Sequence, residues 1–247
     1  LRGALERRFA GWKAAGAPAP GEPAAVAATR GGRLLLVDRP GAPQTVILAA
    51  RPVVPADEPG RALRTAVNVA LGGSFTSRLN QNLREKHGYT YGARSAFQEE
   101  GAQALFLATA DVQTEVTGPA LVELRRELEG VAAATLAAPE VAKAKESARQ
   151  DLVDAVQTSA GLAGALAQAV VARRGPDALG AAAAALEAVD LGSANAEAKR
   201  GPYAFDGLVV VLVGDRKAIA PQLEKAGLPA PTLVDFEGSV VAPTATR

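Results

Sequence analysis

The sequence predicts an α+β fold in which helices pack on one face of a mainly antiparallel sheet. Two observations favour it. Short apolar runs come in pairs, and segments with helical spacing of apolar residues follow them, in the order β-β-α-α-β-β, more helices, then β-α. In addition, 48% of the 247 residues are apolar, which is enough to bury a sizeable core.

We expect residues 1–23 to form a helix and a Pro-rich linker that belong to a preceding domain. Large apolar residues recur there at helical spacing, at Leu1, Leu5, Phe9 and Trp12. Three prolines follow within residues 18–23 and favour an extended connector. The chain contains no methionine, so we expect that its first residue is not a natural translation start. The domain proper is expected to span residues 24–247.

Five strands are expected where short apolar runs are bounded by turn residues. They occupy residues 33–37, 44–50, 90–97, 104–112 and 208–213. Pro52 is expected to end the second strand, because proline cannot donate to a sheet.

Helices are expected where apolar residues recur every three or four positions. They occupy residues 61–71, 77–86 and 118–131, a segment opened by Pro139, Ala-rich stretches within 160–199, and residues 216–226. Gly72 and Gly73 are expected to cap the first helix and form a tight turn, and Gly88 to end the second.

Composition excludes several kinds of function. The 27 basic and 26 acidic residues are dispersed, so no basic face for nucleic acid is expected. The longest apolar stretches are shorter than the roughly 20 residues of a membrane helix, so no membrane span is expected. No phosphate-binding loop motif occurs. Without cysteine, disulfides and thiolate nucleophiles are impossible.

Zinc catalysis by this chain alone is also excluded. A catalytic zinc needs three protein ligands, whereas the chain has one histidine, His87, and no cysteine. Neither H-x-x-E-H nor H-E-x-x-H can be written, and a site made only of carboxylates suits zinc poorly. We expect His87 to be exposed at a helix C-terminus, and we expect no cofactor to be bound by this chain.

Residues 71–92 carry the most specific motif, LGGSFTSRLNQNLREKHGYTYG. It is very similar to the LGG-x-x-x-SRL-x-x-x-LREK-x-G-x-x-Y pattern in the second half of M16-family metallopeptidases, the inverzincins of the pitrilysin and mitochondrial-processing-peptidase type. The similarity extends over most of the chain from about residue 33. The resemblance implies the LuxS/MPP-like metallohydrolase fold and makes residues 24–247 a C-terminal-type, zinc-less domain.

The same resemblance implies a composite enzyme of two related halves that enclose a peptide substrate. One half carries zinc on an H-x-x-E-H helix; the other supplies an Arg and a Tyr seven residues apart, which correspond to Arg84 and Tyr91. In these roles the phenol stabilises the oxyanion and the guanidinium holds substrate carbonyls. The expected partners are thus a peptide and a zinc-bearing half, either upstream in the same chain or in a separate subunit.

Other interpretations of these residues stay open. Tyr91 could be an ordinary strand aromatic, and Tyr89 is an equal candidate until the motif spacing is considered. Arg84 could form a surface ion pair. Arg78 is expected to be structural, buried against the sheet with hydrogen-bonded partners. The Gly72-Gly73 pair could belong to a flexible substrate-sensing loop.

Two functions of different class remain. The first, which we favour, is the zinc-less half of a metalloendopeptidase; the second is a catalytically inactive scaffold or assembly subunit. The presence of both Arg84 and Tyr91 favours the first, because a scaffold does not need that pair. Heavy use of Ala, Gly and Arg indicates a GC-rich bacterial genome, and we expect the periplasm or cell envelope of a Gram-negative bacterium.

Overall fold

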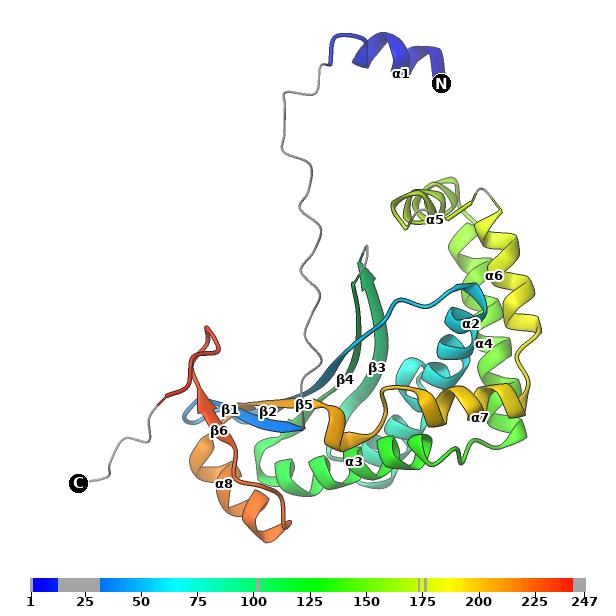
Figure 1. Cartoon of the computed structure of the whole chain (residues 1–247). Coiled ribbons are helices and arrows are strands. Elements are labelled where there is room, and N and C mark those ends of the chain that lie inside the picture. The colour runs from blue at the N-terminus through cyan, green and yellow to red at the C-terminus, as the bar shows by residue number, and fades with distance from the viewer. Residues whose placement is uncertain (1, 13–31, 101–102, 173, 176, 242–247) are drawn as a thin grey trace.

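The computed structural model describes residues 2–12, 32–100, 103–172, 174–175 and 177–241 (Figure 1). The expected start of the domain at residue 24 lies outside these residues.

One six-stranded sheet forms the centre of the domain, with the order β3-β4-β2-β5-β1-β6 (Figure 1). Its strands are β1 Arg33–Asp38, β2 Gln44–Val53, β3 Thr90–Glu100, β4 Gln103–Gln113, β5 Val209–Gly214 and β6 Thr232–Val234. The β3-β4, β4-β2 and β2-β5 pairings are antiparallel, whereas β1 pairs in parallel with both β5 and β6. The expectation of an α+β fold with a mainly antiparallel sheet is therefore confirmed.

The helices are of three types. The α-helices are α1 Arg2–Phe9, α2 Glu58–Asn68, α3 Thr117–Ala132, α4 Ala138–Val156, α5 Ser159–Val171, α6 Ala178–Glu187, α7 Leu191–Arg200 and α8 Arg216–Lys225. Two π-helical segments, η1 Val69–Gly73 and η2 Asn80–Lys86, and two 3-10 turns, η3 Thr114–Val116 and η4 Phe205–Gly207, complete the set.

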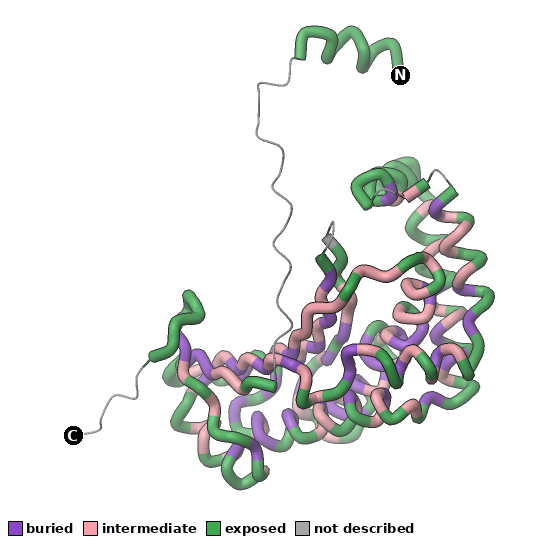
Figure 2. The backbone as a smooth tube through the Cα atoms, in the orientation of Figure 1, coloured by how far each residue is buried: buried purple, intermediate pink, exposed green. Residues whose placement is uncertain are grey.

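The helices cover one face of the sheet, and the alternation of burial along β4 shows which one. Phe106 and Ala108 are buried, whereas Leu105 and Leu107 between and beside them are only partly covered. Such a period of two is expected of a strand that packs on one side. Figure 2 shows burial concentrated where the sheet meets the helices, whereas α1 and α5 are exposed along almost their whole length.

Strand β2 runs past the proline that was expected to end it. Its pairing with β5 stops at Ala50, whereas its pairing with β4 continues through Pro52 to Val53. Pro52 therefore has a strand on one side only, and its missing N–H leaves no ladder bond unmade. Strand β6, three residues long at the sheet edge, was not predicted because so short a run has no periodicity.

The glycine pair after α2 has a different role from the one expected. Neither Gly72 nor Gly73 has a positive φ angle, so they are not a left-handed helix cap. Both lie inside η1, and a Cβ atom on Gly72 would stand 2.5 Å from the backbone nitrogen of Ser95 in β3. Gly72 is required because the two backbones approach closely. The expectation for Gly88 is confirmed, since it ends η2 with a φ of 64°.

Substituting Gly72 should therefore destabilise the fold through a steric clash. We expect Gly72→Ala to lower the free energy of unfolding by about 1–3 kcal/mol, the usual cost of overpacking. Gly180→Ala is the matched control, because nothing lies within 4 Å of that position in α6. There alanine should stabilise the helix by about 0.5–1 kcal/mol. Urea denaturation checks both values, and equal midpoints for Gly72→Ala and the wild type would contradict the clash.

Candidate functional site

The segment from η1 through η2 to the start of β3 contains the motif residues. Both π-helical segments pack directly on β3, the outermost strand on this side of the sheet. π-Helical turns are rare and are often found at functional sites. The loop of residues 74–77 between them is therefore held over the edge of the sheet.

Asn80 joins this loop to the strand. Its side-chain nitrogen donates to the Ser74 carbonyl at 3.1 Å and lies 3.3 Å from the Ser77 hydroxyl oxygen. Its side-chain oxygen accepts the backbone N–H of Ala93 in β3 at 2.9 Å. Asn80 is buried, so these bonds are shielded from water and fix where η2 begins relative to β3.

A second asparagine occupies the same edge of β3. The side-chain nitrogen of Asn68 donates to the Ser95 carbonyl at 3.0 Å, and the Ser95 hydroxyl donates to the Asn68 side-chain oxygen at 2.7 Å. Unpaired strand edges invite pairing with another chain. With Asn68 and Asn80 bonded to it, this stretch of the edge cannot accept an added peptide strand at Ala93 and Ser95.

A β-bulge places Tyr91. Thr90 faces Val112 and Ala93 faces Ala110, so Tyr91 and Gly92 together oppose one residue of β4. The Thr90 hydroxyl donates to the carbonyl of Asp111 at 2.6 Å and accepts the backbone N–H of Gly92 at 3.1 Å. A regular strand would put Tyr91 on the same, helix-covered face as Ala93. The bulge moves it out, and the residue is 90% exposed.

Tyr89 lies in a different environment from Tyr91. It packs against the core and stacks on His87 with ring centroids 4.9 Å apart. His87 is the C-terminal cap residue of η2, as expected, but its side chain is only 24% exposed, so the expectation of an exposed histidine is wrong. The stacking on Tyr89 and the adjacent Glu123, 3.9 Å away, account for this burial.

Arg84 projects from η2 beneath an aromatic ring. Its guanidinium carbon lies 4.2 Å from the centroid of Phe75, within cation–π range. Its nearest carboxylate, Glu85, is 3.7 Å away, and one terminal nitrogen, Nη1, is buried without a hydrogen-bond partner among the described residues. A buried donor without a partner needs an explanation. No hydrogen bond or ion pair joins Arg84 to Tyr91 in the described part of the chain.

Arg78 is structural, but its surroundings differ from those expected. Its guanidinium donates two hydrogen bonds to the carboxylate of Glu140, at 2.6 and 2.7 Å, and two to Thr135. The hydrogen-bonded partners are thus confirmed, although Glu140 lies at the start of α4 and Thr135 just before it, and neither lies on the sheet. The Arg78 bonds hold the pKa of the Glu140 carboxyl below its ordinary value, a shift that partial burial opposes.

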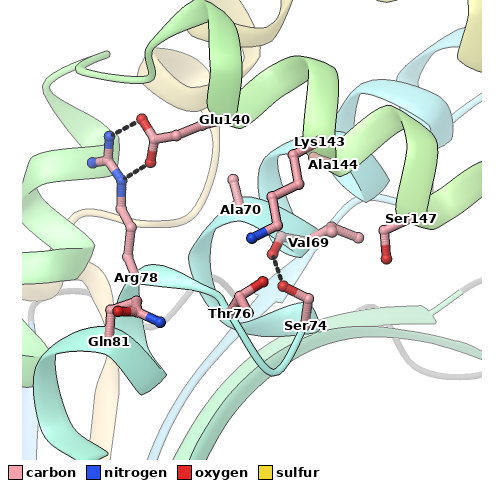
Figure 3. Close-up of a pocket in the computed structure, with 10 residues that line it drawn as sticks. All are labelled: Val69, Ala70, Ser74, Thr76, Arg78, Gln81, Glu140, Lys143, Ala144 and Ser147. Atoms are coloured by element: carbon pink, nitrogen blue, oxygen red, sulfur yellow. Dashed lines mark hydrogen bonds and ion pairs between the residues drawn. The ribbon is translucent and has the colours of Figure 1, made fainter. Parts of the chain in front are cut away.

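A pocket of about 290 Å³ opens between this segment and α4 (Figure 3). Arg78 and Glu140 form one side of it, and Lys143 points from α4 toward the loop of residues 74–77 (Figure 3). The remaining lining residues are Val69, Ala70, Ser74, Thr76, Gln81, Ala144 and Ser147.

The sequence pattern alone does not identify Asn80, Phe75 or Lys143. One feature of the sequence could have pointed to Phe75, because a large aromatic residue between Ser74 and Thr76 is unusual in a polar loop. Asn80 and Lys143 had none, because their partners are separated from them in the chain and are set by the packing of η2 and α4.

No group of three His, Asp or Glu side chains that could hold a metal ion occurs in the described ranges. In the same ranges, no helix is both long and apolar enough to span a membrane. The fold and this segment define an α+β domain that presents Arg84 and an exposed Tyr91.

The chain belongs to the family of M16 peptidase inactive domains. The family model described as "Peptidase M16 inactive domain" matches residues 2–148. The resemblance of the motif to the second half of M16 peptidases is thereby confirmed, and the chain is a non-catalytic, C-terminal-type domain of that family. Among curated proteins, none matches it.

Solved structures show the same fold. An M16 inactive domain from Pseudomonas fluorescens is 22% identical, with a TM-score of 0.65 over 75% of this chain and 45% of that chain. The periplasmic protease PqqL of Escherichia coli is 17% identical, with a TM-score of 0.66 over 87% and 24%. The inactive peptidase domain of a putative zinc protease from Bordetella parapertussis is 14% identical, with a TM-score of 0.57 over 66% and 88%. The chain spans less than half of the first of these structures.

The Arg78–Glu140 pair predicts a pH-dependent stability. Because the folded-state pKa of Glu140 is lowered, its carboxylate stabilises the fold above the ordinary pKa of 4.5, and this is lost as pH falls through the folded-state value. We expect Glu140→Gln to lower the free energy of unfolding by about 1–3 kcal/mol at pH 7. The difference from wild type should close in acid.

Glu146→Gln provides the control for that experiment. Glu146 pairs with Arg149 on the same helix, but both side chains are well exposed, so its removal should leave stability unchanged at either pH. Denaturant unfolding at pH 7 and pH 3.5 measures all three proteins. A Glu140→Gln deficit that persists unchanged in acid would show that lost packing, not the ion pair, is responsible.

Proposed function

We propose that this chain is the zinc-less half of a composite zinc metalloendopeptidase and helps to enclose its peptide substrate. Membership of the M16 inactive-domain family supports this, as does the description of the Bordetella relative as the inactive domain of a putative zinc protease. The zinc and its H-x-x-E-H helix then belong to a partner half, in the same polypeptide or in another subunit. Peptide-bond hydrolysis requires both halves.

Tyr91 is the proposed oxyanion donor. When a zinc-bound hydroxide adds to a peptide carbonyl, negative charge develops on the carbonyl oxygen, and a phenol O–H stabilises that charge. The bulge that exposes Tyr91 supports this role, because it leaves the phenol free to face a substrate on another surface. Tyr89 is less suited, since its ring is packed against the core and stacked on His87.

Arg84 is proposed to hold substrate carbonyl oxygens. The observation that carries the proposal is its buried Nη1 without a hydrogen-bond partner in the described residues, on a side chain that Phe75 keeps in place. A peptide carbonyl would satisfy this donor. Phe75 is itself 66% exposed, so its ring is available to cover the peptide once bound. Asn68 and Asn80 already bond the edge of β3, so its backbone groups at Ala93 and Ser95 are not free to pair with a peptide. The substrate must therefore be bound by side chains at this point.

We also propose where the domain begins and in which compartment the protein is found. We place the domain boundary near residue 24, with residues 1–23 as a helix and linker from a preceding domain. The large apolar residues of α1 and just after it are exposed, at 49% for Leu5, 50% for Phe9 and 77% for Trp12, which fits a surface that packs against another domain. The periplasmic setting of PqqL supports the periplasm or cell envelope as the location.

The tyrosine roles can be tested in the assembly with the zinc half. Tyr91→Phe removes only the hydroxyl, so we expect kcat to fall by about 10²–10³ while KM changes little. Tyr89→Phe is the matched control and should leave both constants close to wild type. Steady-state kinetics on a fluorogenic peptide measures them, with circular dichroism to confirm folding.

The reverse result would reassign the role. If Tyr89→Phe loses kcat and Tyr91→Phe does not, the oxyanion donor is Tyr89. If neither variant matters in an active assembly, the proposed mechanism fails and the inactive scaffold or assembly subunit becomes the better function for this chain.

Arg84 gives a separate prediction. We expect Arg84→Ala to raise KM and lower kcat, with a loss in kcat/KM of about 10- to 100-fold, since hydrogen bonds from a charged donor are lost. Arg84→Lys should recover only part of this, because one ammonium replaces the guanidinium fork. Phe75→Leu should cause a smaller loss of the same kind. Full activity of Arg84→Lys would show that charge alone is needed.

A further inference from the structure

The pocket beside α4 lies next to the proposed substrate site. Ser74 and Thr76 line it, and they flank Phe75, whose ring lies on Arg84. Gln81 also lines it from η2, the segment that carries Arg84. A peptide held by Arg84 and Phe75 therefore has this pocket within reach of a neighbouring side chain.

The pocket carries one uncompensated positive charge. Arg78 and Glu140 neutralise each other through their double hydrogen bond. Lys143 has no ion pair or hydrogen bond to any described residue, and its ammonium points into the pocket over the loop (Figure 3). Among the described residues no acidic side chain other than Glu140 lines the pocket, so no second carboxylate there would compete with an anion for the Lys143 ammonium.

Neutral polar groups complete the lining. The Ser74 hydroxyl donates to the Val69 carbonyl at 3.1 Å. The side chains of Thr76, Gln81 and Ser147 have no hydrogen-bond partner within the described ranges and can donate to a ligand.

Apolar groups supply the rest of the lining: Val69, Ala70 and Ala144. A site of this kind suits an aliphatic stem that ends in an acceptor.

We propose that this pocket is a subsite for a carboxylate, and that the carboxylate is an acidic side chain of the peptide substrate. The inference rests on the proposed function, whose substrate class it narrows. At about 290 Å³ the pocket is near the small end of ligand sites, which fits one side chain and not a whole ligand. A carboxylate is favoured over a phosphate, because Arg78, the fork that would match phosphate, is already occupied by Glu140.

Binding can be measured on the chain itself by NMR. Reductive ¹³C-methylation labels each lysine and keeps its charge, and spectra of Lys143→Gln and Lys217→Gln identify two of the signals. Lys217 is exposed on α8 and outside the pocket, so it serves as the control. The probes are N-acetyl-glutamate amide, N-acetyl-glutamine amide and N-acetyl-alanine, which offer a side-chain carboxylate, no charge and a terminal carboxylate.

We expect N-acetyl-glutamate amide to shift the Lys143 signal saturably and to bind about three- to tenfold more tightly than the glutamine probe. Added salt should weaken that preference, and the Lys217 signal should stay in place. Tighter binding of N-acetyl-alanine than of N-acetyl-glutamate amide would show that the pocket binds the terminal carboxylate of a peptide. That result would overturn the assignment to an acidic side chain. Equal shifts by the glutamate and glutamine probes, equal responses of Lys143 and Lys217, or no response of Lys143 would each overturn the proposal.

The assembled enzyme separates this proposal from the proposed function. For a pair of peptides that differ by one Glu or Gln, the wild-type ratio of kcat/KM should favour Glu by about three- to tenfold, and Lys143→Gln should bring the ratio toward one. Lys217→Gln should leave the ratio unchanged. Loss of kcat in Tyr91→Phe on both peptides, with an unchanged ratio in Lys143→Gln, would retain the peptidase role and reject the acidic subsite.

Discussion

The close approach of the chain at Gly72 to the backbone of β3 at Ser95 sets the position of everything that follows it. A Cβ atom at residue 72 would stand 2.5 Å from the Ser95 nitrogen, so η1 can lie this low over the strand only with glycine. From there the loop of residues 74–77 turns back, Asn80 bonds it to Ala93, and η2 carries Arg84 along the sheet. The contact between Arg84 and Phe75 therefore depends on the absence of a side chain at residue 72.

Most elements could be predicted because they depend on local patterns. Apolar runs located β1 to β5, and helical spacing located α3 and α8 to within one or two residues. The errors have tertiary causes. Pro52 is tolerated because β5 no longer flanks β2 there, and Gly72 is needed because η1 lies against Ser95 of β3. Neither cause can be read from neighbouring residues in the sequence.

The candidate site shows the same division. Arg84 and Tyr91 were selected by motif spacing, which says nothing about what each side chain meets. The structure supplies the difference between the two tyrosines, since Tyr89 packs on the core and Tyr91 does not. It also divides the two arginines of the motif: Arg78 is saturated by Glu140 and Thr135, whereas Arg84 keeps a donor free within the described chain. The sequence analysis assigned different roles to the two arginines but could not name Glu140, Thr135 or Phe75 as their partners, because these contacts are made by tertiary packing.

Because of the bulge at Tyr91 and Gly92, exposure of the Tyr91 phenol depends on how many residues β3 and β4 each have at this point. Since two residues of β3 oppose one of β4, inserting a single residue into β4 between Ala110 and Val112 would restore one-to-one pairing and turn the Tyr91 side chain to the covered face that Ala93 occupies. A homologue could then keep the tyrosine and lose its phenol from the surface. In alignments of such domains, a one-residue insertion between the positions of Ala110 and Val112 would mark loss of the exposed phenol as surely as a substitution of Tyr91.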